Sequence, residues 1–455
     1  MAKLPFEITA RHTSGSSAMF IAIVDGKEVA TERYSLGASR RRHETARKWA
    51  ADKRLCGNSS VTASDVEAEL EALELRVKDD IDSAAREESG PVLERASYVD
   101  DAIIAELTWN WDSAAADFIV RNRETGETAR ARQLETASGI ITPPAACDGI
   151  VTPGPGVEGA ALLPSECDQR NCDDARLRRD IRGFIERYVE LPGASVLIAV
   201  VYVLLTWVYD AFAELAYLGF RTADVGRGKS RALETVGTLC YRPLVVGGGS
   251  SAAATLRMLN AFGGTLLADE FDRSANTELG ADLNRILNQG FQRQRPLIKC
   301  DGEDNAPRPF RCFGPKIFAL RQQLGDDATE SRTIFIHMQQ RTRSDVPICL
   351  PHQKFHKEAL AIRNRLLAWR FANLGKIKVD PRLAAPELED RANQIGLPLL
   401  AVARSDAVRA QIVAALKEQQ GAVAADRADS LPGAVFEAVL AVGEIGDEVR
   451  PGAVA

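Results

Sequence analysis

An α/β fold with a mostly parallel sheet is predicted, followed by a helical region and preceded by a small α+β module. Between residues 217 and 338, short apolar segments read as strands, and helical patterns separate the early ones, which is typical of a parallel sheet. Beyond residue 339, apolar residues recur at helical spacing. The chain has 455 residues, of which 45% are hydrophobic, which is enough for a sizeable core. This length predicts about two to four domains.

Residues 1–105 are predicted to form the N-terminal α+β module. Strands come first, with Asp25-Gly26 as a hairpin turn, and a basic helix then covers residues 39–54. A basic helix can lie on a phosphate backbone, or its charges can simply face solvent. Acidic residues dominate the next stretch, 61–105, and their carboxylates could screen the basic helix. The residues of this helix that we assign to nucleic-acid binding are Arg40, Arg41 and Arg42.

The remaining domain boundaries are predicted from composition. Residues 106–138 hold a hairpin pattern with Trp109 and Trp111, whose indoles would point to opposite faces of a strand. One indole then belongs to a core, and the other belongs to a core or to a base-stacking surface. Residues 139–175 are rich in Pro and Gly and read as a linker. The last two ranges are 176–345, the core with the parallel sheet, and 346–455, the helical C-terminal domain.

A phosphate-binding loop is predicted after the first strand of the core. Gly228-Lys229-Ser230 matches the end of the G-x-x-x-x-G-K-[ST] pattern, in which backbone N–H groups and a helix start surround phosphates. Lys229 would reach the β- and γ-phosphates of ATP, and the Ser230 hydroxyl would bind Mg²⁺. Ala223 stands where the first glycine is expected, and Gly226 can compensate by adopting a positive φ. The same triplet is also compatible with an ordinary loop before a helix.

An acidic strand end completes the predicted site. The segment 264–270 is apolar until it ends in Asp269 and Glu270. We assign Asp269 to the Mg²⁺ ion or its water shell, and Glu270 to the orientation of the attacking water. The helix after Ser230 favours this assignment, because apolar residues recur along it at helical spacing.

A collinear set of motifs extends across the second half of the chain, from residue 185 to about residue 427. The motifs are Thr206-Trp-Val-Tyr-Asp210, Gly228-Lys-Ser-Arg-Ala-Leu-Glu234, Gly237-Thr-Leu-Cys-Tyr-Arg-Pro243, Phe262-Gly-Gly-Thr-Leu-Leu-Ala-Asp-Glu270, Phe313-Gly-Pro-Lys-Ile317, Glu330-Ser-Arg332 and Arg363-Asn-Arg-Leu-Leu-Ala-Trp-Arg370. On these motifs the chain resembles helicase-like P-loop ATPases that are found beside primases in mobile elements and some bacterial genomes. The order of the motifs also resembles that of AAA+ ATPases: phosphate loop, Asp-Glu strand, sensor strand, arginine-finger segment, last strand and helical lid.

The resemblance implies an ATP-driven ring that acts on nucleic acid, and hence a homo-oligomer with DNA and a primase or another replication protein as partners. In the AAA+ pattern, Arg332 would reach the γ-phosphate of a neighbouring subunit and act as a catalytic residue in trans. The alternative is a surface ion pair of Arg332 with Asp326, Asp327 or Glu330. A basic stretch beside the core provides a second candidate surface for DNA, with Arg293, Arg295 and Lys299.

Two departures from the family pattern leave the rate of hydrolysis open. Ala223 replaces a glycine of the phosphate loop, and the sensor strand ends in Ala319-Leu320-Arg321, without a small polar residue. The alternative function is therefore a nucleotide-sensing regulatory or structural protein that binds ATP with little hydrolysis. A transporter-like or signalling ATPase is disfavoured because no membrane-spanning pattern is evident.

Charge and cysteine content bound the class of protein. The net charge of −6 and the pI of about 5.7 exclude a globally basic coat for nucleic acid, although a local basic patch remains possible. Eight cysteines without an evident signal peptide predict reduced thiols in the cytoplasm. The uncharged run 194–209 is shorter than the ~20 residues that span a bilayer, so a buried helix is expected there.

One group of metal-ligating residue types stands out in the C-terminal part. Cys349, His352 and His356 resemble part of a metal site, but no fourth ligand is evident from the sequence. We therefore interpret these three residues as core or surface residues.

Overall fold

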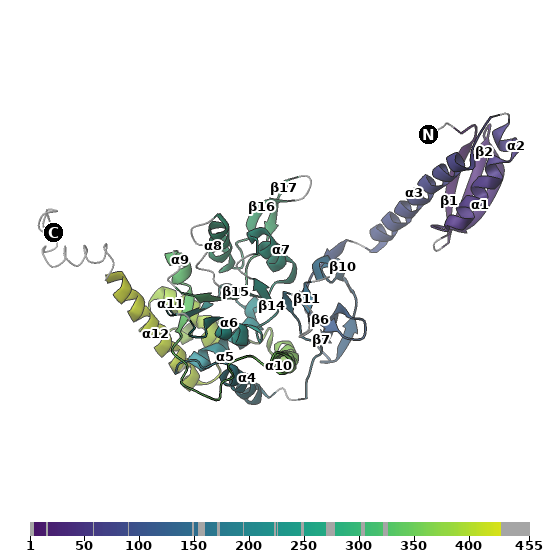
Figure 1. Cartoon of the computed structure of the whole chain (residues 1–455). Coiled ribbons are helices and arrows are strands. Elements are labelled where there is room, and N and C mark those ends of the chain that lie inside the picture. Colours follow the sequence, from purple (N-terminus) through teal and green to yellow (C-terminus); the bar gives the residue numbers. More distant parts are fainter. Residues whose placement is uncertain are drawn as a thin grey trace, which may run out of the picture. The chain divides into compact units, whose positions relative to one another are not determined.

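The chain forms two compact units in the computed structural model (Figure 1). The first unit comprises Met1–Leu93 and Glu135–Ile141, and the second comprises Glu94–Leu134 and Thr142–Ala455. The second unit thus includes residues 94–105, which the sequence interpretation places in the N-terminal module. The structure describes residues 4–14, 17–57, 59–89, 91–147, 150–152, 160–170, 173–193, 195–222, 224, 226–246, 250–269, 278–301, 305–321 and 326–428.

The first unit packs two longer helices on an antiparallel sheet with the strand order β1-β2-β3. The alternating apolar residues of the central strand place Phe20 in a core with Trp49 and Val66, all of which are buried. A smaller sheet, β4-β10-β9, lies mostly in this unit. The elements are β1 (Glu7–Ser14), β2 (Ser17–Val24), β3 (Lys27–Ser35), α1 (Ser39–Ala50), α2 (Lys53–Cys56), α3 (Ala63–Ser89), β4 (Val92–Glu94), β9 (Leu134–Thr136) and β10 (Gly139–Thr142).

A four-stranded antiparallel sheet begins the second unit, and a buried ionic network anchors it to the core. Its strands are β5 (Ser97–Val99), β6 (Ile103–Asn110), β7 (Ala115–Asn122) and β8 (Thr128–Ala131). The Glu106 carboxylate of β6 is fully buried and accepts hydrogen bonds from Arg370 Nε at 2.7 Å and from the Tyr241 hydroxyl at 2.6 Å. Burial alone lowers the pKa of Arg370, but the carboxylates of Asp210 and Glu106 outweigh it and raise this pKa well above its usual value.

A seven-stranded sheet forms the centre of the second unit, with the order β11-β12-β14-β15-β18-β13-β19. The five strands from β14 to β19 are mutually parallel, and β12 joins β14 in the antiparallel sense. The predicted α/β class with a mostly parallel sheet is therefore confirmed, while β11 and β12 come from the segment that the sequence suggests is a linker. The strands are β11 (Val151–Thr152), β12 (Ala161–Leu162), β13 (Tyr217–Arg221), β14 (Pro243–Val246), β15 (Thr265–Asp269), β18 (Lys316–Leu320) and β19 (Thr333–His337).

Helices cover both faces of this sheet. On one face, α6 (Lys229–Gly237) lies so close to β15 that a Cβ atom at Gly237 would meet the Leu267 side chain at 2.5 Å. On the other face, the Tyr217 hydroxyl donates to Leu287 O of α8 (Glu278–Gly290) at 2.6 Å. α6 packs against β13, β15 and β18, and α7 (Ala252–Phe262) packs against β14 (Figure 1).

The helices α5 (Ser195–Thr206), α10 (His352–Asn373), α11 (Asp390–Val402) and α12 (Asp406–Ala428) lie where the sequence patterns predict helices. α5 is buried along almost its whole length, as the uncharged run predicts, and none of the helices in the described ranges is long and apolar enough to cross a bilayer. The sequence pattern also predicts a helix around residues 431–443 of the C-terminal domain, and this range lies outside the described residues. The elements not yet named are η1 (Ala145–Cys147), α4 (Asp174–Tyr188), η2 (Tyr209–Ala211), β16 (Leu297–Asp301), β17 (Ala306–Phe310), α9 (Asp327–Glu330) and η4 (Pro381–Leu383).

Candidate functional site

The predicted phosphate loop joins the carboxyl end of β13 to the start of α6. Gly226 and Gly228 adopt φ angles of 80° and 82°, a left-handed conformation that residues with a Cβ atom rarely occupy. Gly228 is the N-cap of α6, so the helix begins at Lys229 as the sequence predicts. Ala223, the residue that departs from the phosphate-loop pattern, lies outside the described residues.

Lys229 folds back over this loop. Its Nζ atom donates to Thr222 O at 3.3 Å and to Asp224 O at 3.4 Å, so the ammonium group lies against loop carbonyl oxygens. The first backbone N–H groups of α6 have no intrahelical acceptors, and they carry the positive end of the helix dipole. The loop therefore combines a lysine with a helix N-terminus, two features that favour an anion.

Ser230 and Asp269 meet beside the loop although they lie on different elements. Ser230 Oγ donates to Asp269 Oδ1 at 3.1 Å, and Asp269 is the last residue of β15. A hydroxyl and a carboxylate are oxygen ligands of the kind that Mg²⁺ prefers. Glu270, the residue assigned to water activation, is outside the described residues.

Sheet topology explains why these residues converge. The strand order places β18 between β13 and β15, and all three strands are parallel, so their carboxyl ends share one edge of the sheet. After β13 the chain continues to β14, which lies on one side of β13, and after β18 it continues to β19, which lies on the other side of β13. Ligands of open α/β sheets bind at such a point of reversal, outside the carboxyl ends of the strands.

A cavity of about 310 Å³ lies next to the phosphate loop. Its walls include Tyr188, Gly226, Met338 and Ile348. Arg231 of α6 fixes one wall, because its guanidinium donates to Pro347 O at 3.1 Å and to Ile348 O at 2.9 Å. The cavity therefore places apolar and polar groups within reach of a ligand held at the loop.

Arg332 contacts an amide side chain that lies between it and Asp326, because Asn288 Nδ2 donates to Asp326 Oδ2 at 2.8 Å. Its Nη1 atom donates to Asn288 Oδ1 at 2.7 Å, and its guanidinium lies 4.9 Å from the ring centroid of Phe291. Within the described ranges Arg332 forms no direct ion pair, so the alternative of a surface pair with Asp326, Asp327 or Glu330 is not observed. Burial lowers the pKa of Arg332, and the charge of Arg391 lowers it further. Arg391 lies over the same Phe291 ring at 5.7 Å, which makes this a site of concentrated positive charge that the sequence did not reveal.

The basic stretch after α8 leads into a two-stranded hairpin, β16-β17, that the sequence analysis did not predict. Lys299 pairs with Arg308 across the two strands, which adds a basic residue to the predicted set. Arg293 and Arg295 are exposed, and Arg293 also donates to the carbonyl oxygen of Asp210. The sequence gives little signal for the second strand, Ala-Pro-Arg-Pro-Phe, because prolines are uncommon within strands.

The arginines of α1 differ in their surroundings. Arg42 is 12% exposed and donates at 3.0 Å to Glu71 and to Glu74, both on α3. Arg40 and Arg41 are 93% and 72% exposed and pair with Glu44 of the same helix. Arg42 therefore helps to hold α1 against α3, whereas Arg40 and Arg41 face solvent.

The metal-ligating residue types of the C-terminal part acquire a neighbour from α6. His352 and His356 lie near Glu234, a residue that the sequence analysis did not connect with them, and Cys349 is outside the group. Burial raises the pKa of Glu234. Burial lowers the pKa of His356, and the positive charge of Arg363 lowers it further. Only the tertiary structure could reveal this group, because α6 and α10 are far apart in the sequence.

Comparisons with known proteins identify two helicases of distant structural similarity. No family model matches the chain, and no curated protein sequence matches it. A solved structure described as an active helicase, SCCmec type IV Cch, aligns at 12% identity and a TM-score of 0.36, over 96% of this chain and 76% of that one. The JCV helicase aligns at 12% identity and a TM-score of 0.23, over 60% of this chain and 67% of that one.

Proposed function

We propose that this protein is a Mg²⁺-dependent ATPase that acts on DNA in a helicase-like manner. The observation that carries the proposal is the hydrogen bond between Ser230 and Asp269, at the mouth of a loop with two left-handed glycines. A hydroxyl and a carboxylate at the carboxyl edge of a parallel sheet, beside a helix that opens with lysine, suit a nucleoside triphosphate and its metal ion.

Each residue of the site has a distinct role in this proposal. The backbone at Gly226 and Gly228 surrounds the phosphates, and Lys229 leaves the loop carbonyls to contact the β- and γ-phosphates. Mg²⁺, when bound, neutralises charge on the phosphate oxygens, with Ser230 and Asp269 as its protein ligands. Glu270, one residue beyond β15, orients the attacking water. The cavity bounded by Tyr188 and Ile348 accepts the nucleoside.

Arg332 would serve a neighbouring subunit in a homo-oligomer. It forms no ion pair within the described ranges, and Arg391 adds a second positive charge beside it. A γ-phosphate of a second subunit would supply a negative charge in direct contact with Arg332, and an arginine in trans can raise turnover about 10³-fold or more. This role needs an assembly with ATP at the subunit interface.

DNA would contact the basic hairpin of the same unit. Lys299 and Arg308 face each other across β16 and β17, and Arg295 precedes the hairpin. Contacts with phosphates need no base specificity, so we infer salt-sensitive and sequence-tolerant binding. Arg40 and Arg41 provide a second exposed basic surface. A cytoplasmic role in the replication of a mobile element, with a primase as partner, rests on the family resemblance alone.

The second candidate is an ATP-binding regulatory protein with little hydrolysis. β18 ends in Ala319 and Leu320, both buried and apolar, so this strand offers no polar side chain there to the phosphates. Phosphate release by the full-length protein, with and without DNA, distinguishes the two functions. ATP binding without phosphate release under both conditions would favour the regulatory protein.

The phosphate loop is tested by Lys229→Ala. Loss of a charge-assisted contact should weaken Mg-ATP binding about 10- to 100-fold and abolish DNA-stimulated turnover. The matched control is Lys417→Ala, which removes an exposed lysine of α12. Fluorescent ATP binding and phosphate release should be unchanged in this control. Equal ATP binding by Lys229→Ala and the wild type would place the nucleotide elsewhere.

A further inference from the structure

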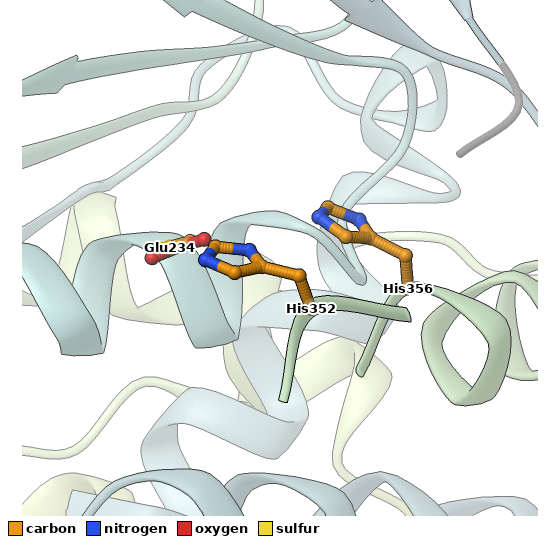
Figure 2. A group of neighbouring side chains, drawn as sticks. All are labelled: Glu234, His352 and His356. Atoms are coloured by element: carbon orange, nitrogen blue, oxygen red, sulfur yellow. The ribbon is translucent and has the colours of Figure 1, made fainter. Parts of the chain in front are cut away.

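Three side chains that can ligate a metal ion converge between α6 and α10. Figure 2 shows Glu234 of α6 facing His352 and His356 of α10. One ligand atom from each of these residues lies within 4.8 Å of the other two. The two imidazole rings are nearly parallel, at 16°, with their centroids 6.2 Å apart.

Local structure fixes this convergence. His352 and His356 are four residues apart on a helix, so their side chains share one face, as in helical zinc motifs. Glu234 lies on α6, and Arg231 of the same helix binds the carbonyl oxygens of Pro347 and Ile348, just before α10 begins. The two helices are therefore linked next to the cluster by contacts that involve none of its members.

His356 has ligand capacity that the protein does not use. Its Nδ1 atom is buried and has no hydrogen-bond partner among the described residues. Buried polar atoms are nearly always satisfied, so one without a partner indicates an additional group. A metal ion bound at this nitrogen would satisfy it.

We propose that Glu234, His352 and His356 form a binding site for a divalent transition-metal ion, with Zn²⁺ as the preferred ion. Two imidazoles and one carboxylate are a ligand set that Zn²⁺ favours, with a fourth position left for water or another ligand. Metal–ligand bonds of about 2.0–2.2 Å in tetrahedral geometry separate the ligand atoms by about 3.4 Å. Side-chain rotations that move the ligand atoms by roughly 1 Å would therefore bring them to this separation. The oxygen ligands Ser230 and Asp269 suit Mg²⁺ instead.

Such an ion would join α10 to the helix that opens with Lys229 and Ser230. The ion would cross-link two helices that are far apart in the sequence. Because an ion that binds only the folded protein stabilises it by mass action, Zn²⁺ should raise the melting temperature. The inference does not depend on ATP binding or on the proposed activity.

The test uses the full-length protein freed of metal with a chelator. Calorimetric titration with ZnCl₂ should give one strong site, and Co²⁺ in its place should show the visible absorption of a tetrahedral ion. Glu234→Gln, His352→Ala and His356→Ala should each lower Zn²⁺ affinity by about 10- to 100-fold or more. Substitution of residues that only hydrogen-bond to metal ligands already has effects of this size. The control His43→Ala removes an exposed histidine of α1 and should leave the affinity unchanged.

Two further measurements keep the result interpretable. Thermal melting of the metal-free variants establishes whether they are folded. If an alanine variant does not fold, Glu234→Gln and His356→Gln replace it, because glutamine keeps a side chain of similar size. Ser230→Ala and Asp269→Asn should bind Zn²⁺ as the wild type does. Absence of a strong site in the wild type, unchanged affinity in Glu234→Gln and His356→Gln, or loss of Zn²⁺ only in the Ser230 and Asp269 variants would each overturn the proposal.

Discussion

Lys316 carries its amino group into the interior at the start of β18, where it is fully buried. Its Nζ atom donates to the carbonyl oxygens of Gly290, Cys312 and Gly314 at 3.3, 3.0 and 3.0 Å. These contacts join the sheet to the end of α8. The charge is costly to bury, and burial lowers the pKa of Lys316 from 10.5 to about 8.

This shift predicts a pH dependence of stability. Between pH 8 and 10.5 the unfolded chain holds more protons at Lys316 than the folded chain does, so the contribution of Lys316 to stability rises with pH across this window. This contribution to the free energy of unfolding changes by at most about 1.4 kcal/mol per pH unit. Burial raises the pKa of Cys240 and Tyr217, and such groups act in the opposite direction, so the prediction concerns a difference between two proteins. Urea unfolding followed by tryptophan fluorescence at a series of pH values should show the stability of the wild type rising relative to that of Lys316→Met.

The exposed lysine of α12 supplies the matched control for that measurement. Lys417→Met removes a charge of the same kind from the surface, and the difference in stability between the wild type and this variant should stay constant across the window. A constant difference between the wild type and Lys316→Met would show that Lys316 does not cause the predicted change.

At the scale of elements, the sequence predicted the segments whose apolar residues follow a clear period. The apolar run Lys316-Ile-Phe-Ala-Leu320 predicts a strand with the ends of β18, and the uncharged run 194–209 predicts the buried helix α5, because burial of whole segments is visible in composition. The hairpin β16-β17 was missed because β17 reads Ala-Pro-Arg-Pro-Phe, and two prolines in five residues argue against a strand. The neighbourhood of Glu234 was missed for another reason, since tertiary packing alone brings it to α10.

The hairpin carries a prediction about DNA. Lys299→Ala combined with Arg308→Ala removes two positive charges that face each other across the strands. Binding of single-stranded DNA should weaken, and the slope of log affinity against log salt should become about 1.4 smaller in magnitude, at about 0.7 for each lost phosphate contact. Fluorescence anisotropy over a range of salt concentrations measures both.

The comparison variant is Arg40→Ala with Arg41→Ala, on α1. These arginines are more exposed than Arg42 and lie in the first compact unit. If the slope of log affinity against log salt decreases in magnitude more in the α1 variant than in the hairpin variant, the main DNA contact lies in the N-terminal unit. An unchanged slope in a protein with all four substitutions would contradict both assignments.

At the scale of the whole molecule, one chain provides the phosphate loop and the metal-binding residues of the proposed ATPase site, and a second chain would provide the arginine finger. The loop, Ser230 and Asp269 come together within one sheet edge. Arg332 precedes β19 at the amino end of that strand, whereas the phosphate loop follows the carboxyl end of β13. Because β13 and β19 are parallel neighbours, Arg332 lies at the opposite edge of the sheet from the loop of its own chain. An arginine finger at this position therefore requires a neighbouring subunit.

Mixing experiments test this arrangement. Arg332→Ala should bind ATP as the wild type does and hydrolyse it at least ~10³-fold more slowly, because only the transition-state contact in trans is lost. Lys229→Ala should fail at the binding step instead. Mixed oligomers of the two variants should regain some phosphate release, since one interface then combines an intact loop with an intact arginine. Full activity of a preparation shown by light scattering to be monomeric, or no rescue in mixed oligomers shown by native mass spectrometry to contain both variants, would exclude a role for Arg332 in trans.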